Sequence, residues 1–256
     1  NSWQSTNSSS GALEANTLLA EFRSSSFDFL YSNKQPEQNL SLNCGILNQP
    51  NSVIMLQNNI TTSSTCYTIT VDNVTLNGNG YTIFGDGGSA DYGVTTTRIN
   101  STIKNLKVNG FDRGISFSGA INSFIFNNTV QNSSRGIYMV NSQGSEISEN
   151  NVSNNTDGIY IQSSGDTPNK IINNTVHSNT NGISSIGSYT NTYEGNIILN
   201  NSAGFKITSG ASNEIIQANQ FRGNNYGIYL VSTSENLLLN NNFSGNNYSI
   251  FDEEII

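Results

Sequence analysis

Two carboxylates and two guanidinium groups recur in the sequence at a regular spacing. Asp112 and Arg113 are followed about 22 residues later by Arg135, and Asp157 comes after a further interval of about 22 residues. Carboxylates act as general acids and bases, and a cation beside them tunes that role. These four residues are the candidates for catalysis. The alternative is that Arg135 and Asp157 form an ordinary surface ion pair.

A second set of outward side chains follows the same spacing. It consists of Tyr138, Tyr160, Lys206 and Tyr229. Aromatic faces beside polar groups suit sugar rings, so these residues are the candidates for ligand binding. Stacked tyrosines also stabilise neighbouring strands by a few tenths to about 1 kcal/mol per pair, which is the purely structural alternative.

Both sets are positioned by a repeat. A glycine followed by an apolar residue returns every 22 to 24 residues or so, a period typical of solenoids. These repeat glycines are Gly114, Gly136, Gly158, Gly182, Gly204 and Gly227, with Ser249 as the last equivalent and Gly93, Thr68 and Gly45 as earlier ones.

Three apolar columns accompany the repeat glycines. One begins with Ile115, Ile137 and Ile159, a second with Val108, Val130 and Val152, and a third with Ile103, Ile125 and Ile147. The local pattern alternates, which favours strands over helices. We expect an all-β parallel β-helix of about nine or ten coils, with three short strands per coil.

Asparagine also forms columns. One consists of Asn128, Asn150, Asn174, Asn196, Asn219 and Asn241. At a strand spacing of about 4.8 Å, such side chains can hydrogen-bond from coil to coil as a structural ladder. Asn and the repeat glycines also tolerate the left-handed backbone that a tight corner needs. A row of sugar-binding amides is the functional alternative.

Cys44 and Cys66 are one coil apart, so they lie almost above each other on neighbouring coils. This separation fits a disulfide, which indicates an oxidising, extracellular or cell-surface location. Two buried free thiols are the alternative.

The two ends differ from the repeat. We expect residues 1–40 to be a tail and capping segment, with a short helix at about 11–24, and residues 41–256 to be the β-helix. The C-terminal coil shows no cap. It is either blunted by its acidic residues or covered by a further domain or a second subunit, which makes head-to-tail self-assembly plausible.

The composition limits the classes of binding partner and cofactor that we expect. The net charge is −8 and no basic stripe is present, so nucleic acid is not expected. No apolar run has transmembrane length, and we expect no metal or other cofactor. His177 follows an inward valine and should face solvent, and Met55 and Met139 are too far apart in the repeat for copper. Calcium near Asp86 and Asp91 stays open as an alternative, although their spacing fits no EF-hand loop.

The segment "LNCGILNQPNSVIMLQNNI" with "VTLNGNGYTIFGDG", at about residues 42–87, and the later "NNT…GIY" units resemble secreted right-handed β-helix proteins of the carbohydrate-binding and sugar-hydrolase repeat group, which includes the NosD-like family. The resemblance covers roughly residues 42–250 and implies right-handed winding. The group mixes lyases, epimerases, accessory proteins and surface proteins. The paired-Asp and Gly-His-Gly motifs of polygalacturonases and the Asp-Pro-His motif of alginate epimerases are absent from this chain.

Asn-x-Ser/Thr sequons are frequent and predict N-glycans if the protein is exported in a glycosylating organism. The candidates are Asn59, Asn73, Asn100, Asn127, Asn132, Asn151, Asn154, Asn173, Asn200, Asn242 and Asn247.

These patterns favour a non-enzymatic, exported surface or extracellular structural protein that is glycosylated and assembles end to end into a filament or lattice. A polysaccharide lyase or epimerase of the β-helix class is the first alternative. A glycan-binding adhesin is the second.

Overall fold

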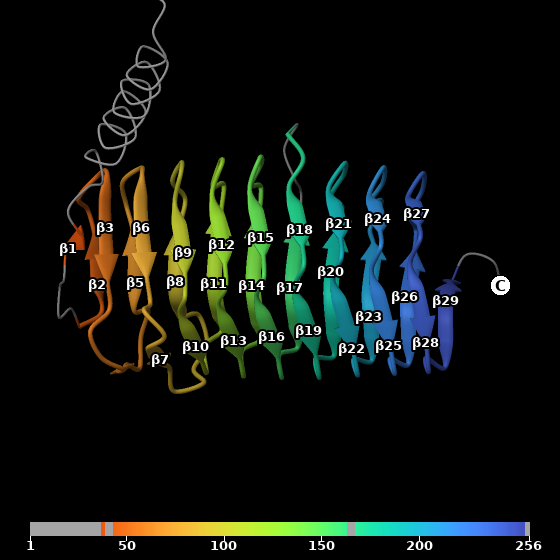
Figure 1. Ribbon diagram of the computed structural model, residues 1–256, viewed down its shortest axis with the longest axis horizontal. Helices are drawn as coiled ribbons and strands as arrows, with labels where there is room; N and C mark the ends of the chain where they lie inside the picture. Colours follow the sequence, from red (N-terminus) through yellow and green to blue (C-terminus); the bar gives the residue numbers. More distant parts are fainter. Residues whose placement is uncertain (1–36, 39–42, 163–166, 254–256) are drawn as a thin grey trace, which may run out of the picture. The chain divides into compact units, whose positions relative to one another are not determined.

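The computed structural model describes residues 37–38, 43–162 and 167–253. These residues belong to one compact unit, Glu37–Ile256. Within it, short strands follow one another around successive coils (Figure 1). The predicted helix at about 11–24 lies outside the described residues.

The strands form three parallel sheets, A, B and C. Sheet A contains β1 (Glu37–Gln38), β3 (Ser52–Met55), β6 (Val74–Asn77), β9 (Thr102–Lys104), β12 (Phe124–Phe126), β15 (Glu146–Ser148), β18 (Lys170–Ile172), β21 (Thr192–Glu194), β24 (Ile215–Gln217) and β27 (Leu237–Leu239). Sheet B contains β2 (Gly45–Leu47), β5 (Tyr67–Ile69), β8 (Tyr92–Thr96), β11 (Arg113–Ser118), β14 (Arg135–Val140), β17 (Asp157–Gln162), β20 (Asn181–Ile186), β23 (Ala203–Thr208), β26 (Tyr226–Val231) and β29 (Tyr248–Asp252). Sheet C contains β4 (Ile60–Thr61), β7 (Thr82–Phe84), β10 (Lys107–Asn109), β13 (Thr129–Gln131), β16 (Asn151–Ser153), β19 (Thr175–His177), β22 (Ile197–Leu199), β25 (Gln220–Arg222) and β28 (Asn242–Ser244).

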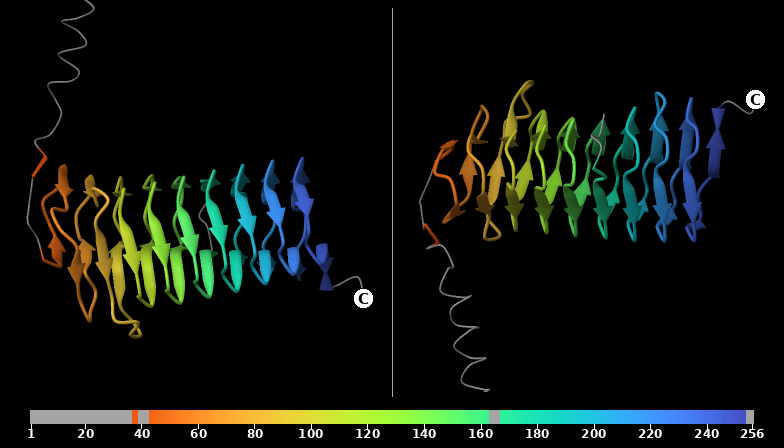
Figure 2. Two further views of the ribbon diagram at one scale, coloured as in Figure 1. Left: turned by 60° about the horizontal axis from the view of Figure 1, so that its bottom comes forward. Right: turned by 90° about the horizontal axis from the view of Figure 1, so that it is seen from above.

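From β2 onward, neighbouring strands of a sheet are three places apart along the chain, which is the connectivity of a parallel β-helix; β1 pairs with β3. One coil therefore contributes one strand to each sheet, in the order B, A, C (Figure 2). The predicted solenoid of about nine coils is confirmed by the nine strands of sheet C.

The three apolar columns fill the interior as predicted. Ile115 pairs with Ile137, and Ile137 pairs with Ile159, all three fully buried. The columns on sheets A and C are equally buried. Since neighbouring coils are about 4.8 Å apart, each aliphatic side chain packs directly on its equivalent in the next coil.

Asparagine ladders line the inside of the corners. In the ladder between sheets A and C, the side-chain amide of Asn150 donates to Asn174 Oδ1 at 3.0 Å, and that of Asn174 donates to Asn196 Oδ1 at 3.0 Å. The same oxygens accept backbone amides of the preceding coil. The ladder therefore satisfies buried corner groups that the sheets leave unpaired.

The expected role of the repeat glycines was wrong. Gly158 does not have a positive φ; a Cβ there would lie 2.5 Å from the Gly182 carbonyl oxygen and 2.8 Å from Val176 Cγ1. These glycines are therefore needed for close approach of successive coils. The left-handed positions precede the ladders instead, as at Asn154 and Asn173, with φ of 57° and 55°.

The expected register of the first two coils was also wrong. Tyr67 pairs with Val94, and Gly45 pairs with Tyr67, so Cys66 and Cys44 occupy the position of the repeat glycine. This shift turns the Ile46 side chain outward, where it is 66% exposed. Because coils approach most closely at the glycine position, the two cysteines reach a Cα–Cα distance of 4.3 Å and form a disulfide.

The last described coil has no neighbour on one side. Its inward-facing apolar side chains are partly open to solvent, as Ile250 is at 49% exposure. No helix in the described part of the chain is long and apolar enough to cross a membrane.

Candidate functional site

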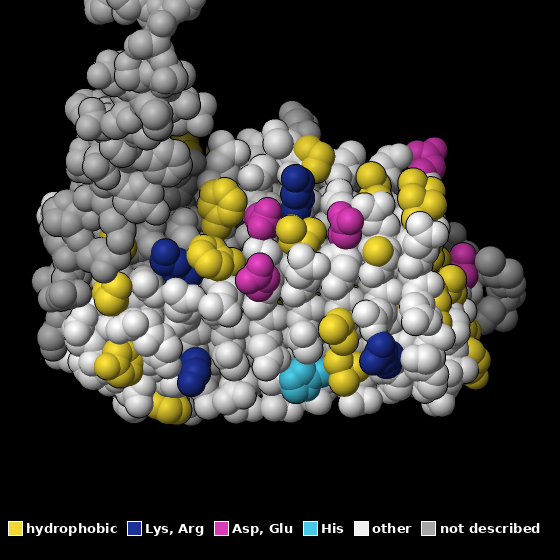
Figure 3. Space-filling model, viewed as in Figure 1, with side chains coloured by type: hydrophobic (Ala, Val, Ile, Leu, Met, Phe, Trp, Pro, Cys, Tyr) yellow, Lys and Arg dark blue, Asp and Glu magenta, His cyan; other side chains and the backbone are white. Residues whose placement is uncertain are grey.

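The predicted site residues lie on the outer face of sheet B, in two neighbouring columns. The residue before each repeat glycine forms one column, which runs through Arg113, Arg135 and Asp157. The second residue after each glycine forms the other column, in which Tyr138 pairs with Tyr160. On the face that Figure 3 shows, a few Lys, Arg, Asp and Glu side chains stand among uncharged polar groups and backbone.

The two columns contact each other through rings and guanidinium groups. The Arg113 guanidinium lies 5.3 Å from the ring centroid of Tyr92 and 4.2 Å from that of Tyr138. Arg135 lies 5.1 Å from the ring centroid of Tyr138 and 4.3 Å from that of Tyr160. We call these five residues the Arg–Tyr stack. Each arginine therefore contacts two rings, and Arg135 lies beside the stacked pair Tyr138 and Tyr160, whose centroids are 5.2 Å apart.

Hydrogen bonds and ion pairs tie the stack to its surroundings. Arg113 Nη1 donates to the Tyr92 hydroxyl at 2.9 Å, and its Nε lies 3.9 Å from Asp112 Oδ2. Arg135 Nε lies 3.9 Å from Asp157 Oδ2. The structure therefore brings all four catalytic candidates to three successive coils.

Asp157 is the best-positioned carboxylate of the face. Its Oδ1 accepts hydrogen bonds from Asn181 Nδ2 at 2.9 Å and Ser184 Oγ at 2.8 Å, which leaves Oδ2 toward Arg135. Burial raises the pKa of the neighbouring Tyr160 hydroxyl, and the charge of Arg135 opposes that rise. Tyr160 therefore stays protonated at neutral pH, and its hydroxyl donates a hydrogen bond to Gln162 Oε1 at 3.0 Å.

Lys206 and Tyr229 lie farther along the same face. They line a pocket of about 190 Å³, together with Asn181, Ser202, Ala203 and Tyr226. The Tyr229 hydroxyl donates to Glu253 Oε2 at 2.9 Å, and this hydrogen bond raises its pKa. The ring of Tyr229 is parallel to that of Phe251, with centroids 5.6 Å apart.

A polar groove that sequence reasoning missed follows the corner between sheets C and B. Its volume is about 640 Å³, and its lining includes Thr156, Thr180, Asn200, Ser202 and Asn225. None of its lining residues is charged. The sequence did contain a signal for this groove, because an uncharged polar residue stands two positions before each of several successive repeat glycines. The groove meets the Lys206 pocket at Ser202, which lines both.

A buried polar cluster inside the solenoid was also missed. Glu214 is fully buried and takes the place of an asparagine in a corner ladder. Its Oε1 accepts from Ser185 Oγ at 3.0 Å and from Ser188 Oγ at 2.6 Å, and its Oε2 accepts the Asn191 backbone amide at 2.9 Å. Burial raises the pKa of Glu214, although these hydrogen bonds oppose the rise.

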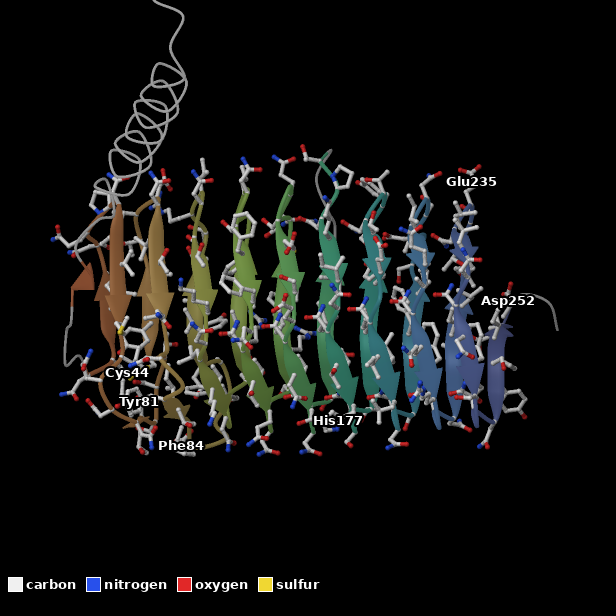
Figure 4. The ribbon with its side chains drawn as sticks, in the orientation of Figure 1. Cys44, Tyr81, Phe84, His177, Glu235 and Asp252 are labelled. Carbon is white, nitrogen blue, oxygen red and sulfur yellow. A yellow bond between two sulfur atoms is a disulfide. The ribbon has the colours of Figure 1, made fainter. Side chains whose placement is uncertain are left out.

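The other predicted candidates do not form a site together. His177 lies on the outside of the solenoid (Figure 4), where its ring nitrogens contact Ser178 Oγ and Asn151 Oδ1. Asp86 Oδ1 accepts the Gly88 amide within a turn, and Asp91 Oδ1 accepts the Asp112 amide. Within the described ranges, no three His, Cys, Asp or Glu side chains gather as metal ligands would.

Comparison with known proteins agrees with this architecture. A family model described as a right handed beta helix region matches residues 41–216. No curated protein matches the sequence.

Several solved structures share the fold. DFA-IIIase from Arthrobacter chlorophenolicus A6 in complex with DFA-III has a TM-score of 0.67 at 10% identity, over 78% of this chain and 63% of that one. Alginate lyase from Paenibacillus sp. str. FPU-7 has a TM-score of 0.54 at 14% identity, over 77% of this chain and 92% of that one. Pectate lyase Pel9A has a TM-score of 0.51 at 14% identity, over 73% of this chain and 62% of that one. The matched region thus spans less than two thirds of the DFA-IIIase and Pel9A chains. At these identities the likeness shows the fold alone.

Proposed function

Because this chain belongs to the right-handed β-helix family, we propose that it processes polysaccharides, as a lyase or epimerase, on the outer face of sheet B. The observation that carries this proposal is the Arg–Tyr stack with Asp157 beside it. Here two arginines, a carboxylate and aromatic rings converge on successive coils of this face.

The chemistry of a lyase or an epimerase begins with removal of a proton next to a carboxyl group. Negative charge then develops on that carboxyl group, and fixed cations stabilise it. Arg113 and Arg135 are held in place for this role by their ring contacts. Asp157 is the proton acceptor of the cluster.

The polar groove and the rings beside the stack supply the rest of a polysaccharide site. The rings of Tyr138 and Tyr160 are stacked with centroids 5.2 Å apart, and together they offer an apolar edge to a sugar. Thr156 lies in the groove directly before Asp157, so a chain bound along the corner would pass beside the carboxylate.

The compared structures support a catalytic role over the purely structural role that the sequence first favoured. They are named as a lyase of alginate, a lyase of pectate and a DFA-IIIase, and all use this fold. We therefore rank the non-enzymatic, structural role below the catalytic one.

The test is degradation of alginate and polygalacturonate, followed by the ultraviolet absorbance of unsaturated products and by the C5 configuration of the residues. Arg135→Ala and Asp157→Ala should each lower the rate at least 100-fold. The matched control is Arg222→Ala, which removes an exposed arginine from β25 on sheet C. If both site variants keep the wild-type rate, the catalytic assignment is wrong. Binding of glycans without any turnover would instead favour the adhesin.

One observation favours end-to-end assembly as a second role. At the open edge of the last described coil, the inward-facing Ile250, which pairs with the buried Ile228, is 49% exposed. Such an edge templates addition of another strand layer. Sedimentation should then show particles that lengthen with concentration, and Ile250→Lys should abolish the lengthening. A constant monomer mass would exclude this role.

We also propose that the protein is exported and glycosylated. The Cys44–Cys66 disulfide supports an oxidising location. Each sequon asparagine named above is exposed, so a glycan attached to it would face solvent. Mass spectrometry of native material tests both statements, through the disulfide-linked peptide and the sequon peptides.

A further inference from the structure

The pocket around Lys206 exists because one small residue interrupts a column of larger ones. Along the column before the repeat glycines, Asn181 pairs with Ala203 and Ala203 pairs with Tyr226. Ala203 is buried, and its methyl group leaves a hollow between an amide and a phenol on the neighbouring coils. The resulting volume is about 190 Å³.

The only charge in the lining of this pocket is that of Lys206. Lys206 lies between Ser184 and Tyr229 in its column, so no carboxylate occupies the equivalent position on either neighbouring coil. The nearest acids along the face are already engaged. Asp157 is bound by Asn181 and Ser184 on one side, and Glu253 by Tyr229 on the other.

The wall facing the C-terminal coil is aromatic and rigid. The rings of Tyr226 and Tyr229 lie 5.2 Å apart at 50°, and Tyr226 stacks on Tyr248 with centroids 5.3 Å apart. Phe251 packs against both Tyr226 and Tyr229. The rings therefore offer a fixed surface for the apolar side of a sugar ring at little entropic cost.

The opposite wall is polar. It is formed by the Asn181 amide and the Ser202 hydroxyl, and Ser202 also opens onto the corner groove. At about 190 Å³ the pocket is smaller than the roughly 300–1,000 Å³ of pockets that enclose drug-sized ligands. It therefore suits one sugar-sized group rather than a longer segment.

We propose that the Lys206 pocket is a subsite for one sugar unit that bears an anionic group, a carboxylate or a sulfate ester. Lys206 pairs with the anion, the tyrosine wall packs on the ring, and Asn181 and Ser202 bind hydroxyl groups. The pocket lies two coils, or about 10 Å, from Tyr160. This inference rests on the proposed function, because it makes the pocket part of the same polysaccharide face.

The experiment measures binding of three probes by titration calorimetry: trigalacturonate, a sulfated carrageenan tetrasaccharide and neutral maltotriose. We expect the wild-type protein to prefer one or both anionic probes, and the preferred probe identifies the anion. Lys206→Met should weaken anionic binding about three- to tenfold and leave maltotriose unchanged. Lys206→Arg should restore anionic binding. Tyr226→Ser should weaken all three probes.

The control is Lys170→Met, which removes an exposed lysine from β18 on sheet A. Equal affinity for charged and neutral probes would overturn the inference, and so would a Lys206→Met protein that binds as the Lys170→Met protein does. If Arg135→Ala abolishes binding of trigalacturonate while Lys206→Met does not affect it, the proposed function stands and the subsite is wrong. If no probe binds the wild-type protein, the subsite is wrong, and the degradation of alginate and polygalacturonate decides the proposed function separately.

Discussion

Replacing one asparagine of the inner ladder tests the physical basis of the fold. Asn174 lies in the middle of the solenoid and is fully buried. Its side-chain amide donates to Asn196 Oδ1 at 3.0 Å and to the carbonyl oxygens of Ile147 at 2.9 Å and Ile172 at 3.1 Å. Its Oδ1 accepts both the backbone and the side-chain amide of Asn150, each at 3.0 Å.

The cost of Asn174→Ala follows from this list. The carbonyl groups of Ile147 and Ile172 lose the Asn174 amide but can still accept hydrogen bonds within the sheets. The buried backbone amide of Asn150, in contrast, loses its acceptor. An orphaned buried donor costs about 1–3 kcal/mol, and each further lost hydrogen bond about 0.5–1.5 kcal/mol. We expect the free energy of unfolding to fall by about 3–4 kcal/mol. Asn242→Ala removes an exposed asparagine from β28 and should change it by less than about 0.5 kcal/mol.

A serine at the same position should recover part of the loss. Ser123 occupies a ladder elsewhere in the chain, where its Oγ accepts the Ser101 backbone amide at 3.0 Å. Asn174→Ser should therefore satisfy the Asn150 amide and cost about half as much as Asn174→Ala.

Urea unfolding followed by circular dichroism measures these differences, and hydrogen exchange at the Asn150 amide locates them. Exchange at that amide should accelerate in Asn174→Ala and stay slow in Asn174→Ser. If Asn174→Ala and Asn242→Ala unfold at the same urea concentration, the ladder contributes no more than surface asparagines, and the reasoning fails.

Three further perturbations have defined outcomes. Gly158→Ala would place its Cβ 2.5 Å from the Gly182 carbonyl oxygen, and the required shift should cost about 1–3 kcal/mol in urea unfolding; an unchanged midpoint would show that the coils need no glycine there. The pKa of Glu214 is raised in the folded state, so its stabilising contribution is complete below about pH 4.5 and declines as the pH rises toward the folded value; Glu214→Gln should flatten this part of the stability–pH profile, and parallel profiles would contradict the assignment. Loss of the Cys44–Cys66 disulfide through Cys44→Ser with Cys66→Ser should lower the free energy of unfolding by about 2–4 kcal/mol, and a melting temperature equal to that of the parent protein would refute it.

The fold was predictable because several residue types recur in the sequence with the same period. Ile115, Ile137 and Ile159 stand at the same phase of the repeat, and each coil buries its column on the next. The phase is harder to read where the repeat is irregular. In the first two coils the glycine position is occupied by Cys44 and Cys66, so the nearby Gly45 misled the register by one residue.

The sequence predicted which residues lie on the outer face of sheet B, but not how their side chains are arranged there. The sequence places Arg113, Arg135, Tyr138 and Tyr160 on one side of adjacent coils, because outward positions alternate with inward ones. It does not say whether an arginine turns toward a carboxylate or toward a ring. In the structure each guanidinium contacts two rings, and its ion-pair carboxylate is 3.9 Å away.

Pockets on a solenoid depend on contrasts between neighbouring coils rather than on any one motif. Ala203 would pass unnoticed in a linear reading, since alanine carries no chemistry of its own. It makes a pocket because the coils on either side carry Asn181 and Tyr226 at the same position.

The interior of the solenoid tolerates such differences between the outward residues of neighbouring coils. Since the ladders and apolar columns already hold each coil in place, an outward residue can change size or charge with little effect on the backbone. A binding face can therefore be composed coil by coil, with the Arg–Tyr stack on one group of coils and the Lys206 pocket two coils farther along. It follows that Arg135→Ala and Lys206→Met should alter different steps of recognition while both proteins unfold at nearly the wild-type urea concentration.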